Sequence, residues 1–93
     1  MIMSIEKAKE TKDRLMGTPE AMMLKWKRFN KCNAYTARYN DQYDLIRSYT
    51  TIVGIVDKSN RMMYELGKWS KTTTKQMTLI HRNLYGYCEF ARV

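Results

Sequence analysis

Residues 49–56 read YTTIVGIV, and this stretch decides the fold class. It is rich in Thr, Ile and Val, the residue types that fit a pleated, half-buried β-strand best. Successive side chains of a strand point to opposite faces, and here both faces carry apolar residues. We therefore expect a strand that is covered on both sides. Gly54 within it indicates a β-bulge or the close approach of another backbone.

A second strand is predicted directly after this one. Residues 57–61 (DKSNR) are polar and typical of a turn, and residues 62–66 (MMYEL) return as an apolar run. The two runs predict a β-hairpin over residues 49–56 and 62–66. Because an isolated hairpin is only marginally stable in water, helices or an intermolecular strand must cover it.

The N-terminal part of the chain predicts a first helix over about residues 4–16. Ser4 fits the N-cap and Gly17 fits the position after the C-cap. Between them the apolar stripe is thin and the remaining side chains are of mixed charge. Residues 1–17 are therefore expected to dock weakly on the rest of the domain, or on a partner.

Thr18-Pro19-Glu20 predicts a second helix start, because Thr suits the N-cap and Pro suits the first helical position. No Gly or Pro follows until Gly54, so this helix is expected to span residues 19–48. Its large apolar residues recur at a mean spacing shorter than 3.6 residues, so the stripe drifts around a straight helix. Either two helices join near residue 40, which we favour, or one long helix supercoils.

The last predicted element is a helix over about residues 72–88. Ser70 or Thr72 would cap it, after a connector that contains Gly67. Apolar residues from Met77 onward follow a helical spacing. The whole sequence of residues 1–93 therefore predicts a single α+β domain with helix, long or broken helix, β-hairpin and helix.

The charge of the chain favours acidic partners. The formal net charge is +8 and the sequence pI is about 9.7. The first 20 residues are electrically neutral, so the excess lies on residues 21–48 and on the C-terminal half. Polyanions or acidic protein surfaces are the expected partners.

Two patterns on the predicted second helix each allow two interpretations. Lys27, Lys31 and Arg38 would share one helical face, either as an ordinary solvated face or as a basic ridge that contacts phosphates. The tyrosines at positions 35, 39 and 43 would also share a face. They would form part of the core or of a subunit interface, which we favour, or a platform for stacking unpaired bases.

The strongest functional pattern is SKTTTKQ at residues 70–76, where the last helix begins. A helix N-terminus offers free N–H groups and a partial positive charge, so hydroxyls and lysines there suit a phosphate group. Plain N-capping is the alternative, and Trp69 would be either a core anchor or an exposed interface residue. The candidate binding residues are Lys27, Lys31, Arg38, Lys68, Trp69, Ser70, Lys71, Thr72, Thr73, Lys75 and Arg82.

The sequence contains few residues that could form a catalytic site or a metal site. His81 is the only histidine, and the two cysteines form no CxxC motif. Cys88 would lie two helical turns from His81, too far for a nucleophile–base pair. No glycine-rich phosphate loop is present. We therefore expect no enzyme, no metal and no cofactor. No apolar run approaches the about 18 residues of a membrane span and no signal peptide is evident, so we expect a cytoplasmic protein.

Residues 49–82 resemble a segment that recurs in small uncharacterised phage and plasmid proteins. The likeness rests on the motif Y-x-T-x-V, which begins at Tyr49 and is followed by Asp57, and on W-S-x-T-T-x-K, which begins at Trp69. Gly54 stands where Ala is usual in that segment, and Gln76 stands where His is usual. The resemblance implies a phage-type accessory protein that acts in a bacterial host, and it implies no known activity.

Two functions are compatible with these observations. The first is a small basic phage-type protein that binds nucleic acid, or a nucleoprotein complex of the bacterial host. Inhibition of a host defence system, in the manner of anti-CRISPR proteins, would fit such a surface. The second is a protein-interaction module or homo-oligomer without nucleic-acid binding, because eight methionines are more than a thin hairpin can bury.

Overall fold

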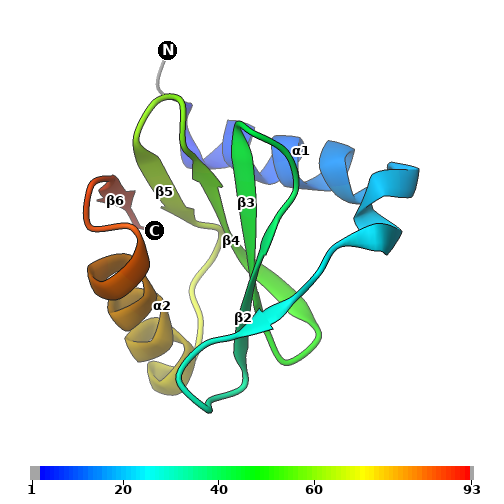
Figure 1. The fold of residues 1–93 in the computed structure, drawn as a ribbon. Helices are drawn as coiled ribbons and strands as arrows, with labels where there is room; N and C mark the ends of the chain where they lie inside the picture. Colours follow the sequence, from blue (N-terminus) through cyan, green and yellow to red (C-terminus); the bar gives the residue numbers. More distant parts are fainter. Residues whose placement is uncertain (1–2, 93) are drawn as a thin grey trace.

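The computed structural model describes residues 3–92, which form a six-stranded mixed sheet with one helix on each face (Figure 1). The strands follow the chain in the order β1-β2-β3-β4-β5-β6. The elements are α1 (Ile5–Met16), the 3-10 helix η1 (Pro19–Met23), β1 (Lys27–Arg28), β2 (Ala34–Arg38), β3 (Tyr43–Ser48), β4 (Thr51–Asp57), β5 (Met62–Glu65), α2 (Lys71–Leu84) and β6 (Glu89–Ala91). This architecture confirms the α+β class.

The predicted first helix is confirmed. The side chain of Ser4 accepts a hydrogen bond from the backbone N–H of Lys7, so Ser4 is the N-cap of α1. Ala8, Thr11 and Leu15 are buried on one side of this helix. α1 therefore docks on the sheet through a narrow stripe of three buried residues.

The predicted helix over residues 19–48 is wrong. Only η1 is helical there, and β1, β2 and β3 occupy the rest. Asn30 and Lys31 adopt left-handed backbone conformations (φ 50° and 58°), which end β1 in a turn. The side chain of Asn40 accepts hydrogen bonds from the backbone N–H groups of Gln42 and Tyr43, which makes a second turn. The expected break near residue 40 is thus a turn between two strands.

The predicted hairpin is confirmed as β4 and β5, and the role of Gly54 is confirmed with it. Ile46 pairs with Gly54 but Arg47 pairs with Ile52, so Val53 is the extra residue of a β-bulge. A Cβ atom on Gly54 would lie 2.6 Å from the terminal methyl of Met77. It would also lie 3.0 Å from the carbonyl oxygen of Tyr64, so glycine at this position avoids close contacts with α2 and with β5.

The last helix begins where the sequence predicted but ends four residues early. Ser70 is its N-cap and accepts a hydrogen bond from the backbone N–H of Thr73. The chain turns after Tyr85 and enters β6, which pairs in parallel with β5. Nε2 of His81 lies 2.7 Å from the carbonyl oxygen of Cys88, and this contact holds the turn against α2.

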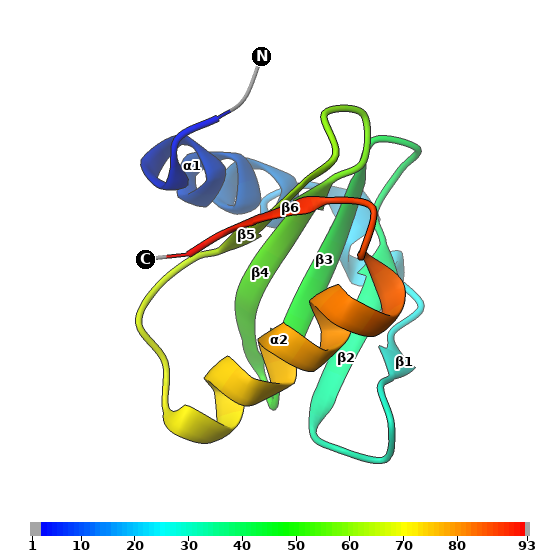
Figure 2. The ribbon, with the colours of Figure 1, turned by 90° about the vertical axis from the view of Figure 1, so that its left-hand side faces the viewer.

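The two faces of the sheet carry separate hydrophobic cores. Figure 2 shows α1 on one side of the sheet and α2 on the other. On the α2 side the core includes Val53, Val56, Met63, Met77 and Ile80. On the α1 side it includes Ala8, Leu15, Leu45, Ile55 and Tyr64. This arrangement explains why residues 49–56 are apolar on both faces. Within residues 3–92, neither helix is long and apolar enough to cross a membrane.

Candidate functional site

A groove runs between α2 and the loop that joins β1 to β2, two segments that lie side by side in Figure 2. It consists of two hollows that share Phe29 and Asn30, the larger of about 570 Å³. We call it the hairpin groove. Its lining residues are Lys27, Arg28, Phe29, Asn30, Cys32, Thr36, Thr72, Lys75, Gln76, Leu79, Asn83, Leu84 and Tyr85.

The shape of the β1–β2 loop is fixed by local contacts. The buried ring of Phe29 anchors the loop in the α2-side core. Nε of Arg28 donates a hydrogen bond to the carbonyl oxygen of Cys32 (2.8 Å), and the same guanidinium also reaches the carbonyl of Lys31 (3.2 Å). The loop therefore holds one wall of the groove in place while the side chain of Lys31 stays exposed.

Among residues 3–92, no carboxylate lines the hairpin groove. The chain contains three stretches without Asp or Glu, at residues 21–40, 45–56 and 66–88, and these carry five, one and four Lys or Arg residues respectively. All nine acidic residues lie outside them. The groove walls come from the first and third stretches, so the fold places two distant basic segments next to each other.

The second acid-free stretch, residues 45–56, meets the other two at one end of the sheet. The backbone N–H of Tyr49, in the β3–β4 turn, donates to the carbonyl of Asn33 (2.8 Å). The hydroxyl of Ser48 donates to Oε1 of Gln76 on α2 (3.2 Å) and lies 3.4 Å from the hydroxyl of Thr73. Three acid-free segments thus meet here.

We call this end of the sheet the basic end. It comprises the hairpin groove, the β3–β4 turn and the cationic side chains of Lys27, Arg28, Lys31, Lys71 and Lys75. Within residues 3–92, the four lysines are exposed and form no ion pair. Their charge is therefore available to a partner.

The start of α2 combines capping with exposed charge. Ser70 caps the helix, and the hydroxyl of Thr73 lies within hydrogen-bonding distance of Ser70 and Ser48. The hydroxyls of Ser70 and Thr73 therefore already have hydrogen-bond partners within the fold. Lys71 and Thr72 are exposed, and Thr72 lines the groove. Only part of the predicted phosphate pattern at residues 70–76 is thus free for a partner.

Several predicted binding residues lie elsewhere. Arg38 pairs with Asp41 at the opposite end of the sheet. Lys68 and Trp69 lie on the other flank of α2, beside Arg92. Trp69 is half-buried, packs against both cores and is a core anchor. Arg82 is exposed on α2, two turns beyond the lysines at its start.

The three tyrosines do not form a common stripe. Tyr43 is buried in the α1-side core, and the hydroxyl of Tyr39 contacts that of Thr18. Tyr35 lies under the guanidinium of Arg47. A stacking platform built from all three rings is therefore excluded by their placement on different strands and turns.

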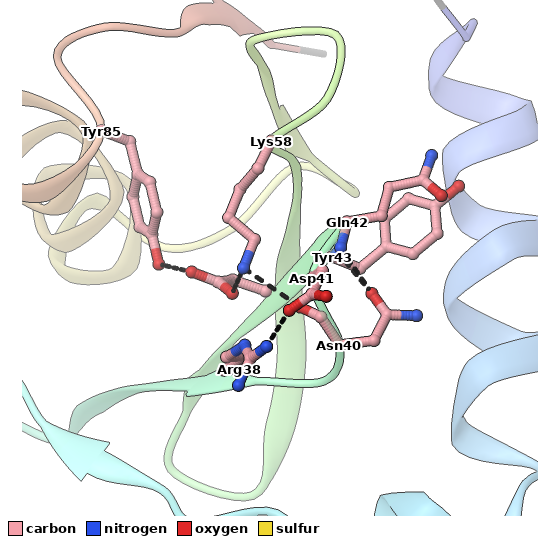
Figure 3. A network of polar contacts seen from close by, with 8 residues as sticks. Arg38, Asn40, Asp41, Gln42, Tyr43, Lys58 and Tyr85 are labelled. Atoms are coloured by element: carbon pink, nitrogen blue, oxygen red, sulfur yellow. Dashed lines mark hydrogen bonds and ion pairs between the residues drawn. The ribbon is translucent and has the colours of Figure 1, made fainter.

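The opposite end of the sheet holds a network of paired charges, which Figure 3 shows from close by. Nζ of Lys58 lies 2.8 Å from Oδ1 of Asp44, and the hydroxyl of Tyr85 donates to Oδ2 of the same carboxylate (2.6 Å). Arg38 pairs with Asp41 close by. Burial, together with the Asp44 carboxylate, raises the pKa of Tyr85 well above its usual value. We call Arg38, Asp41, Asp44 and Lys58 the paired end; Tyr85, which also lines the hairpin groove, connects the groove to it.

Sequence reasoning missed Arg28 and Asn30 as site residues because it placed them on a helix. The signal that could have found them is the run NKCN at residues 30–33, since Asn tolerates the left-handed conformation and marks turns. Within residues 3–92 no cluster of His, Cys, Asp and Glu could hold a metal ion, and Cys32 and Cys88 are free thiols. Burial raises the pKa of Cys88.

A family model matches residues 8–88, from the first buried residue of α1 to the turn before β6. The chain belongs to the DUF8033 family. This is a family of unknown function, and its match includes the whole hairpin groove and the β3–β4 turn. Neither the comparison with curated proteins nor that with solved structures found a significant match.

Proposed function

We propose that this DUF8033 protein binds nucleic acid through the basic end of its sheet. The observation that carries the proposal is a groove whose two walls carry cationic side chains and to which no carboxylate of the described residues 3–92 contributes. Unpaired lysines at the rim repel one another and lose that repulsion when they meet phosphates. Such contacts release counterions from the nucleic acid, which makes binding favourable at low salt.

The uncharged lining of the groove supports nucleic acid over an acidic protein surface. Asn30, Gln76 and Asn83 place amide groups beside the lysines, and within residues 3–92 Gln76 uses only its Oε1 and Asn83 only its Nδ2 in a hydrogen bond. Phosphate oxygens and sugars are commonly bound by such amides together with Lys and Arg. The floor of Phe29 and Leu79 is apolar and suits the faces of sugars or bases.

The biological setting is part of the proposal. The resemblance of residues 49–82 to phage and plasmid accessory proteins supports action in the cytoplasm of a bacterial host. A nucleoprotein complex of that host, including a defence complex of the CRISPR type, is a partner that presents phosphates. Inhibition would follow if the protein occupied the path of the nucleic acid.

A salt titration tests the proposal. Binding is measured by fluorescence anisotropy with labelled oligonucleotides. A length of about 12 nucleotides is within the usual range for a single-strand binding site. If the four lysines each contact a phosphate of a single strand, log Kd should rise with log salt with a slope of about 3. Affinity should therefore fall roughly 60-fold between about 50 and 200 mM salt. Absent or salt-independent binding would contradict the proposal.

A poly-glutamate peptide of similar length is the matched competitor. It offers the same charge without phosphates, sugars or bases, and we expect it to displace the oligonucleotide only at a large excess. Displacement at equal concentration would favour an acidic protein partner instead.

A protein-interaction role is the second candidate, and exposed methionines favour it. Met22 and Met23 on η1 are 91% and 79% exposed. Methionine is adaptable at contact surfaces, and exposed apolar side chains that lie together often mark an interface. Light scattering separates the two roles, because a strict monomer that binds oligonucleotides supports the first and a stable oligomer that does not bind them supports the second.

A further inference from the structure

Arg47 on β3 has an arrangement that the proposed groove does not use. Its guanidinium carbon lies 4.3 Å from the ring centroid of Tyr35, its cross-strand neighbour on β2, and 4.7 Å from that of Trp26, just before β1. Cation–π contacts of this kind hold the guanidinium plane in a fixed orientation. Three segments of the chain therefore converge on one arginine.

The hydrogen-bonding groups of Arg47 have no partner among residues 3–92. No carboxylate pairs with its guanidinium, and its Nε is buried without an acceptor. Two other arginines of the protein pair with carboxylates: Arg38 with Asp41 and Arg92 with Glu65. Arginine is normally placed where it can donate in pairs to a carboxylate or phosphate, so an oriented guanidinium without an acceptor suits an external anion.

Helix α1 leaves this part of the sheet open. Figure 1 shows α1 crossing the sheet away from the β3–β4 turn. Leu45 and Ile55 are buried beneath α1, whereas Arg47 and its partner Ile52, nearer the turn, are only half-buried. Part of the Arg47 side chain is therefore accessible on the face opposite α2, although its Nε is buried.

An exposed aromatic ring lies at the end of the same strand. Tyr49, two residues after Arg47, is 60% exposed and has a left-handed backbone (φ 53°). That conformation is disfavoured for tyrosine and is usually occupied by Gly or Asn. The fold alone gives no reason for an aromatic residue at this position, but a ring at the tip of a turn can stack on a base.

The geometry points to a second contact site, at which Arg47 binds one phosphate of an unpaired nucleic-acid strand and Tyr49 stacks on a neighbouring base. The inference rests on the proposed function and deepens it, because it names a single strand as the ligand. Basic side chains combined with exposed aromatic rings are the usual means of binding single strands. In a duplex the base faces are covered by their neighbours, so Tyr49 would have no ring to contact.

The test compares one sequence as a single strand and as a duplex, using anisotropy titrations at several salt concentrations. Arg47→Met keeps the aliphatic stem and removes the guanidinium. It should weaken single-strand binding about tenfold and lower the salt slope by about 0.7, the contribution of one phosphate. Tyr49→Asn should weaken single-strand binding several-fold without changing the slope, and duplex binding should stay within about twofold in that variant.

Arg61→Asn is the matched control. It removes one positive charge from the β4–β5 turn at the paired end, and Arg61 has the same left-handed φ as Tyr49, 53°. This variant should bind both ligands like the wild type. If Arg47→Met unfolds, Arg47→Lys is used instead; it should retain the salt slope and lose affinity for the single strand.

The outcomes separate this inference from the proposed function. Wild-type protein that binds neither ligand overturns both. Wild-type binding that Arg47→Met and Tyr49→Asn leave unchanged overturns only the second site. An equal loss in Arg61→Asn also overturns it, because the effect would then be one of net charge.

Discussion

The basic end and the paired end of the sheet use the same residue types in opposite ways. At the paired end Lys58 meets Asp44 and Arg38 meets Asp41. At the basic end the exposed lysines form no ion pair with any carboxylate of residues 3–92. Both ends include turns between the same strands, so the difference between them follows the distribution of acidic residues along the chain.

This difference implies that stability and binding are carried by separate parts of the molecule. A partly buried ion pair with a hydrogen-bonded tyrosine stabilises the turns that it joins, and removing one partner leaves an uncompensated charge. Exposed lysines without partners contribute little to stability and repel one another. Substitutions at the two ends should therefore have distinct effects.

The largest expected effect on stability is at Asp44. Asp44→Asn leaves Lys58 without its counter-charge and weakens the acceptor of the Tyr85 hydroxyl. Because the side chains of Asp44 and Lys58 are 15% and 23% exposed, we expect a loss of about 2–3 kcal/mol rather than the larger cost of a fully buried pair. Urea unfolding measures it. A loss below about 1 kcal/mol would show that the paired end does not stabilise the fold.

The double substitution of Lys31 and Lys75 by Gln should weaken binding and leave stability unchanged. Removing two phosphate contacts lowers the salt slope by about 1.4 and weakens oligonucleotide binding at least tenfold at low salt. The free energy of unfolding should stay within about 0.5 kcal/mol of the wild type, since both side chains are exposed. Substitution of Lys7 and Lys9 on α1 by Gln is the control with the same charge change. Equal weakening by both pairs would argue against a localised site.

A smaller effect on stability, opposite in sign to that of Asp44→Asn, is expected at Tyr49. The left-handed conformation costs most residues about 1–2 kcal/mol, and Asn tolerates it better, so Tyr49→Asn should stabilise the protein by about 0.5–1 kcal/mol. Thermal or urea unfolding checks this. Arg61→Asn relieves the same conformation at the paired end and should stabilise similarly while leaving binding intact. Destabilisation by Tyr49→Asn would mean that the ring supports the fold.

The smallest expected effect is at Asp41. Asp41 and Arg38 are both largely exposed, and exposed ion pairs contribute little. Asp41→Asn should therefore change the free energy of unfolding by less than about 0.5 kcal/mol, well below the effect of Asp44→Asn. Urea unfolding of the two variants side by side ranks the two carboxylates. A comparable loss would show that the whole network acts as one unit.

The sequence predicted the elements that carry strong local signals. Ser4 caps α1 as expected, Ser70 is the one of the two candidate caps that begins α2, and most of the β-branched run at residues 49–56 forms β4. Residues 19–48 could not be predicted in the same way. Their helix assignment depended on the absence of Gly and Pro, but Asn30 and Lys31 adopt the left-handed conformation without glycine. The aromatic spacing of 3 and 4 residues arose from strands interrupted by turns.

The candidate site could be predicted only in part. The lysines at the start of α2 were visible because they follow a recognisable helix start. Their neighbours across the hairpin groove were not, since the contact between α2 and the β1–β2 loop depends on tertiary packing through Phe29. Arg47 was missed for the same reason: its approach to Trp26 and Tyr35 requires the register of β2 and β3.

The most direct test of the account is a map of backbone amide chemical shifts during titration with a single-stranded oligonucleotide. If the basic end binds the strand, the amide signals there, including those of Lys31, Tyr49 and Lys75, should shift, and the shifts should become smaller as salt is added. The chemical shifts of the Asp41 and Lys58 amides at the paired end should not change. Changes concentrated at the paired end, or none at low salt, would contradict the claim that the acid-free end of the sheet binds nucleic acid.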